Sequence, residues 1–93
     1  MIVKLRTVDE GWYYFDVDSV KVRTLTKEQY ESGMELNTPN VREIRRFRES
    51  GKDATYEGIK CINCSKINKP LIIYTNMLAY LLNDEGKTIE KLN

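Results

Sequence analysis

The sequence predicts a single α+β domain, rich in strands, in which about six antiparallel strands form a curved sheet or a small, partly open barrel with one or two short helices. Three observations lead to this fold class. Segments near both ends of the chain alternate between apolar and polar residues, the middle carries helix-capping and helix-periodic signals, and turn residues separate the segments. A chain of 93 residues, 41% of them hydrophobic, suits one domain spanning residues 1–93.

The first 25 residues predict a three-stranded meander. Residues 3–7 alternate between apolar and polar side chains, which is the period of a half-buried strand. Gly11 suits the tight turn that follows, because glycine adopts positive φ without steric cost. The aromatic segment 12–15 is the expected second strand, and residues 20–25 are the expected third.

Two helices are expected in the middle of the chain. Thr26 and Gln29 have the spacing of a capping box, in which the threonine hydroxyl accepts from the backbone amide of Gln29. Gly33 is placed to end this first, short helix. Pro39 suits the first position of a second helix, which Gly51 ends. One face of this second helix carries an apolar stripe at helical spacing, formed by Val41, Ile44 and Phe47.

The last third of the chain is strand-like again. Residues 56–62 and 71–75 are the expected strands on either side of a turn that contains both cysteines. Pro70 indicates an edge position or the start of a strand, because proline has no amide hydrogen to donate.

A hairpin is expected at the end of the sequence. Its strands are residues 78–82 and 87–92, joined by a type I turn that Gly86 closes in the left-handed conformation. In the simplest register Leu81 faces Ile89 across the hairpin, and both would then lie in the core.

The residue types that are missing exclude most catalytic chemistry. The chain has no histidine, so it lacks the commonest general base and the commonest metal ligand. The five glycines stand too far apart for a phosphate-binding loop. Neighbouring carboxylates fall in predicted turns, where such residues bond their own backbone. We therefore do not expect an enzyme.

Membrane association is not expected either. No apolar run approaches the roughly 20 residues of a membrane-spanning helix. The strand-like alternation begins at the first residues, where a signal peptide would otherwise stand. The sequence thus predicts a soluble, cytoplasmic protein.

Cys61 and Cys64 have the spacing of one knuckle of a zinc ribbon. A structural zinc ion needs four ligands, and this chain has two thiols and no imidazole. Two chains could share one zinc ion and form a bridged homodimer, and a thioredoxin-like redox role is a further alternative. The simplest expectation is a pair of reduced cysteines in a turn of a cytosolic protein, with no cofactor.

The most basic segment is the predicted second helix, residues 41–52. Arg42, Arg45 and Arg46 fall on one side of it, opposite the apolar stripe, at about 100° per residue. Such a cluster can contact phosphates or an acidic protein surface. Alternatively, Glu49 pairs with the nearest arginines as an ordinary surface contact of a helix.

The aromatic residues point to a binding surface as well. The six tyrosines exceed what a small core usually holds, and tyrosine and arginine are enriched at binding hot spots. Tyr13 and Phe15 share one face of the second strand, and Trp12 and Tyr14 share the other. Tyr13 and Tyr80 are therefore candidate binding residues.

These features favour a small non-enzymatic binding module that recognises a macromolecule, in the first place a protein, through tyrosine and arginine side chains. The alternative is a protein that binds nucleic acid or a nucleotide with its basic helix, and a third hypothesis is a structural homodimer. In composition, the short chain with strands rich in lysine, asparagine and isoleucine resembles accessory proteins of phages and prophages.

Overall fold

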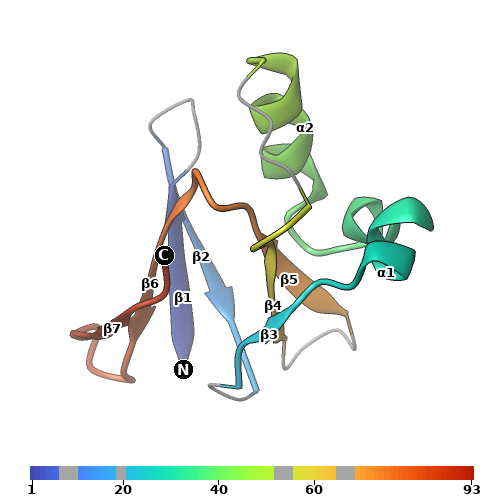
Figure 1. Ribbon diagram of the computed structural model, residues 1–93. Coiled ribbons are helices and arrows are strands. Elements are labelled where there is room, and N and C mark those ends of the chain that lie inside the picture. The colour runs from blue at the N-terminus through green and yellow to red at the C-terminus, as the bar shows by residue number, and fades with distance from the viewer. Residues whose placement is uncertain (7–10, 19–20, 52–55, 65–68) are drawn as a thin grey trace.

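Figure 1 shows the computed structural model of the chain, which describes residues 1–6, 11–18, 21–51, 56–64 and 69–93. Within these residues the strands form two antiparallel sheets, one of four strands and one of three, and no closed barrel. The β-rich α+β class predicted from the sequence is therefore confirmed. Residues 9 and 10 of the predicted first turn, Val20 and Lys52 lie outside the described residues. The strands are β1 (Ile2–Arg6), β2 (Trp12–Asp16), β3 (Arg23–Thr24), β4 (Lys60–Asn63), β5 (Pro70–Ile73), β6 (Leu78–Leu82) and β7 (Thr88–Lys91).

The larger sheet has the order β2-β1-β6-β7 and the smaller sheet the order β3-β4-β5. The predicted hairpin of β1 and β2 is present, but the three-stranded meander is wrong at its third strand, because β3 pairs with β4. The chain leaves the larger sheet directly after β2. There the amide of Val17 donates to the carbonyl of Met1, and the amide of Asp18 donates to the carbonyl of Asn63 at the end of β4. This last bond directs the chain towards the smaller sheet.

The strand predicted at residues 56–62 begins later in the structure of the smaller sheet. The amide of Ile59 donates to the carbonyl of Tyr56 at 3.1 Å, and Gly58 has a φ of +83°, so this stretch is a turn and β4 begins only at Lys60. Pro70 starts β5, one of the two positions that the sequence indicated. Both faces of β4 and β5 are largely buried, which gives these strands their continuous apolar sequence.

The hairpin of β6 and β7 has a bulge that the sequence did not reveal. The register shifts between Leu81 and Leu82, so that Leu81 lies opposite Glu90. The predicted pairing of Leu81 with Ile89 is wrong, since a bulge adds one residue to one strand and moves every later pair by one. Ile89 is accordingly 50% exposed. The predicted turn is confirmed by the φ of +82° at Gly86.

The two helices are α1 (Lys27–Glu31) and α2 (Val41–Glu49), with a 3-10 turn, η1 (Met34–Leu36), between them. The capping box at the start of α1 is confirmed, because Thr26 and Gln29 exchange both of its hydrogen bonds. Gly33 follows α1 with a φ of +74°. The predicted start of the second helix at Pro39 is wrong: Asn40 is the N-cap residue and the helix begins two residues later than expected.

One hydrophobic core joins both sheets and α2. In Figure 1 the helices lie on the same side of the picture as the smaller sheet, and β6 and β7 lie on the other. Of the predicted apolar stripe, Ile44 and Phe47 are buried and Val41 is half-buried. Among the described residues, no helix has the length and apolar character to cross a membrane. The central core residues are Val3, Leu5, Ile44, Phe47, Ile62, Leu71, Ile72, Ile73, Ala79 and Leu81.

Candidate functional site

The larger sheet has one face that points away from the core. On β1, Val3 and Leu5 are fully buried, whereas the residues between and beside them are partly exposed. Antiparallel partners lie on the same face of a sheet, so the register of β2, β6 and β7 against β1 identifies the rest of this surface. We call it the outer face, and its residues are Ile2, Lys4, Arg6, Trp12, Tyr14, Asp16, Leu78, Tyr80, Leu82, Thr88 and Lys91.

Aromatic and cationic side chains alternate across the middle of the outer face. Lys4 on the central strand β1 is paired with Tyr14 on one side and with Tyr80 on the other. Tyr80 is in turn paired with Lys91 on β7. Adjacent strands lie about 4.8 Å apart, so the two tyrosines stand roughly 10 Å apart with a lysine between them. Tyr14 is 59% exposed, which is the largest exposure of an aromatic side chain here.

Trp12 anchors one end of this surface. The ammonium of Lys4 lies 4.2 Å from the centre of the Trp12 ring, and the guanidinium of Arg6 lies 5.7 Å from it. The ring of Tyr80 is 6.1 Å from that of Trp12 at a tilt of 49°. Cation–π contacts of this kind are worth about 0.5–1 kcal/mol at exposed sites. They hold the charged groups over the sheet and leave 37% of Trp12 exposed.

The arginines predicted as binding residues lie on another surface. Arg42, Arg45 and Arg46, which we call the α2 arginines, are all exposed, and Ile44 lies buried on the side of the helix that faces the core. Glu49 is exposed on the same helix and makes no ion pair within the part of the chain that the structure describes.

The five predicted binding residues are thus divided between two places. Tyr13 is half-buried on the inner side of β2, where its hydroxyl accepts a hydrogen bond from Nη1 of Arg46 at 2.6 Å. Tyr80 lies on the outer face, on the opposite side of the sheet. The structure brings Tyr13 to the α2 arginines and Tyr80 to Trp12.

Sequence reasoning missed four outer-face residues: Lys4, Arg6, Trp12 and Tyr14. The signal was available in part, because the alternation on β2 already placed Trp12 and Tyr14 on one face. The alternation on β1 likewise separates Lys4 and Arg6 from the buried Val3 and Leu5. What the sequence lacked was the register that sets these two pairs side by side.

The cysteines lie inside the protein. Cys61 belongs to β4 and is fully buried, and Cys64 follows that strand and is 4% exposed, so the expectation that both stand in a turn is wrong. Burial raises the pKa of both thiols, and the nearby charge of Asp18 raises the pKa of Cys64 further. Zinc binds thiolates, which burial disfavours, and a shared site would need sulfur atoms at the surface. The described residues contain no group of three or more Cys, Asp and Glu that could hold a metal ion.

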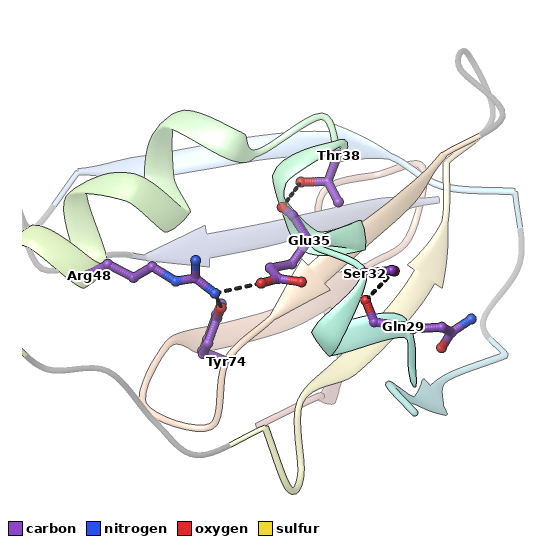
Figure 2. Close-up of polar contacts among 6 residues, drawn as sticks. All are labelled: Gln29, Ser32, Glu35, Thr38, Arg48 and Tyr74. Atoms are coloured by element: carbon purple, nitrogen blue, oxygen red, sulfur yellow. Dashed lines mark hydrogen bonds and ion pairs between the residues drawn. The ribbon is translucent and has the colours of Figure 1, made fainter. Parts of the chain in front are cut away.

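A buried polar cluster connects η1 to α2. Figure 2 shows the guanidinium of Arg48 between Glu35 and Tyr74, with Nη2 at 2.6 Å from Oε1 of Glu35 and 2.5 Å from the tyrosine hydroxyl. Glu35 and Tyr74 are almost completely buried, and burial raises the pKa of Tyr74. Oε2 of Glu35 has no hydrogen-bond partner in the described structure. The cluster holds the segment before α2 against the core, with Glu35 and Tyr74 buried and the Arg48 side chain 28% exposed.

Comparison of the chain with protein-family models, with curated proteins and with solved structures finds no significant match.

Proposed function

We propose that this protein is a small, non-enzymatic binding module that binds single-stranded nucleic acid on its outer face. The observation that carries the proposal is the row Tyr14–Lys4–Tyr80–Lys91, in which aromatic rings and cations alternate on four adjacent strands. Exposed rings offer a stacking surface to bases, worth about 1–3 kcal/mol per base, and every base has such a face. The cations between them suit phosphate oxygens.

Nucleic acid is favoured over a protein partner by the position of the charges. The cores of protein interfaces are depleted of lysine, and charged residues gather at their rims. Here Lys4 stands at the centre of the surface, between Tyr14 and Tyr80. A cytoplasmic location belongs to the same proposal, because the two cysteines are unpaired thiols.

The chain contains a built-in reporter, since Trp12 is its only tryptophan and lies in the proposed site. The test is a titration of the protein with oligothymidylate and oligouridylate of about 12 nucleotides, within the usual range of site sizes. We expect stacking to quench the fluorescence of Trp12. We also expect the binding constant to fall with salt, at a slope of about −0.7 per phosphate contact.

Matched variants connect this signal to the outer face. Lys4→Glu and Tyr14→Ala should weaken binding roughly tenfold or more, since each removes a contact of 1–3 kcal/mol or reverses a charge. Lys27→Glu makes the same charge reversal on the exposed side of α1 and should leave binding unchanged. Circular dichroism establishes that each variant is folded. Absence of oligonucleotide binding at low salt would overturn the proposal.

An acidic protein surface is the second candidate, and one observation favours it. Arg6 lies between Trp12 and the 37% exposed Leu78 on the outer face, and arginine and tryptophan are enriched at hot spots. Polyglutamate of the same charge as the oligonucleotide is the probe that separates the two. If polyglutamate binds as tightly as the oligonucleotide, base stacking contributes nothing and the acidic protein becomes the better hypothesis.

A further inference from the structure

The edge strand β2 separates the outer face from the α2 arginines. It stands at the end of the strand order, so β1 is its only neighbour in the described sheet. Trp12 and Tyr14 point to the outer side of β2, and Tyr13 points to the other side. There Arg46 donates to the hydroxyl of Tyr13 at 2.6 Å in an exposed contact. One strand therefore carries the stacking residues on one side and touches the basic helix on the other.

Positive charge is concentrated on the α2 arginines and on the outer face. The α2 arginines are exposed. Their helix also carries two carboxylates, of which Glu43 is only 7% exposed and Glu49 is exposed. The outer face adds the cations Lys4, Arg6 and Lys91 against a single carboxylate. Because the whole chain has a net charge of +1, the rest of its surface is net acidic. A polyanion is therefore attracted to these two surfaces and repelled elsewhere.

We infer that a nucleic-acid strand bound on the outer face continues over the edge of β2 and that its next phosphates contact the α2 arginines. The inference rests on the proposed function and adds a second segment to the same site. Guanidinium groups suit this segment, since their fork matches two phosphate oxygens. A nucleic acid that bends around the edge of β2 must be single-stranded and flexible, because duplex DNA has a persistence length of about 150 base pairs.

Oligonucleotide length distinguishes the two segments. An oligothymidylate of about 4 nucleotides can cover the outer face, and one of about 16 can also reach α2. The double variant Arg42→Glu/Arg45→Glu leaves the contact of Arg46 with Tyr13 in place. We expect this variant to bind the long oligonucleotide roughly tenfold or more weakly and the short one with unchanged affinity. Lys4→Glu should weaken both, and Lys27→Glu neither.

The outcomes separate this inference from the proposed function. If both oligonucleotides bind, both depend on Lys4, and the arginine variant binds the long one normally, then the strand does not reach α2 and only this inference fails. An equal loss of affinity for both lengths would also overturn it, because the short oligonucleotide would then contact α2 as well. If neither oligonucleotide quenches Trp12 or binds at low salt, the proposed function itself is wrong.

Discussion

The side chain of Asn40 takes the place of a neighbouring strand along the edge of β5. Its Nδ2 donates to the carbonyl of Ile72 at 2.8 Å, and its Oδ1 accepts from the amide of the same residue at 3.2 Å. Thr38 donates to the same oxygen at 3.2 Å, and Asn40 is fully buried. Buried backbone groups require hydrogen-bond partners, and β5 is the last strand of its sheet. This pairing engages the Asn40 amide, which makes no capping bond to the first turn of α2.

Removal of the Asn40 amide should destabilise the protein strongly. Asn40→Ala leaves the amide and the carbonyl of Ile72 buried without partners, and each such group costs about 1–3 kcal/mol. We expect the free energy of unfolding, measured in urea, to fall by about 2–5 kcal/mol. Asn37→Ala is the control, because Asn37 accepts only an exposed bond from Lys69, and its loss should be under about 1 kcal/mol. Equal effects of the two substitutions would contradict the role of Asn40.

Removing one charge of the Arg48–Glu35 ion pair should destabilise the protein more than removing both. Arg48→Met leaves a carboxylate that is 3% exposed without its charged partner, which costs about 3–5 kcal/mol in buried pairs. The double variant Glu35→Leu/Arg48→Met removes both charges and should regain most of that loss. Thermal and urea denaturation of both variants provide the comparison. A double variant no more stable than Arg48→Met would mean that lost packing, and not the unpaired charge, determines the effect.

Because of the bulge in the last hairpin, substitutions of Leu81 and Ile89 should cost different amounts of unfolding free energy. In the simpler register the two residues were equivalent. Leu81 is 1% exposed and Ile89 is 50% exposed. Leu81→Ala should therefore cost about 2–5 kcal/mol of unfolding free energy by loss of packing. Ile89→Ala should cost less than about 1 kcal/mol. Comparable losses at both positions would restore the register in which the two residues face each other in the core.

Stability should decrease in alkali. Burial raises the pKa of Cys61 and Cys64 above the usual 9.0 of a thiol, and that of Tyr74 above the usual 10.0 of tyrosine. The folded state therefore holds these protons more tightly than the unfolded state does. The resulting stability is complete below about pH 9 and is lost as the pH rises through the folded-state pKa values.

Urea denaturation between about pH 7 and about pH 10.5 measures this loss. The variant Cys61→Ala/Cys64→Ala should lose less stability over that range than the original protein, whatever its stability at pH 7. A thiol reagent should also react slowly with the native protein at neutral pH, since both thiols are buried. Rapid reaction of both thiols in the folded protein would refute the burial on which the pH dependence rests.

The sequence by itself determined the features that depend on a few consecutive residues. The capping box of Thr26, the positive φ at Gly33 and Gly86, and the alternation along β1 follow from contacts within one turn or from the pleat of one strand. The exposure of the α2 arginines opposite the buried Ile44 follows in the same way from the period of a helix. Such local physics acts whatever the rest of the chain does.

Only the tertiary structure decided which local surfaces meet. Alternation showed that Trp12 and Tyr14 share a face, but it was the burial of Val3 and Leu5 in the common core that turned this face outward beside Lys4. Asn40 and Ile72 are 32 residues apart, and no local pattern in the sequence indicates that they pair. A periodic pattern indicates whether a side chain is buried or exposed. Which residue it packs against depends on the free energy of the whole core, and a short segment does not determine that free energy.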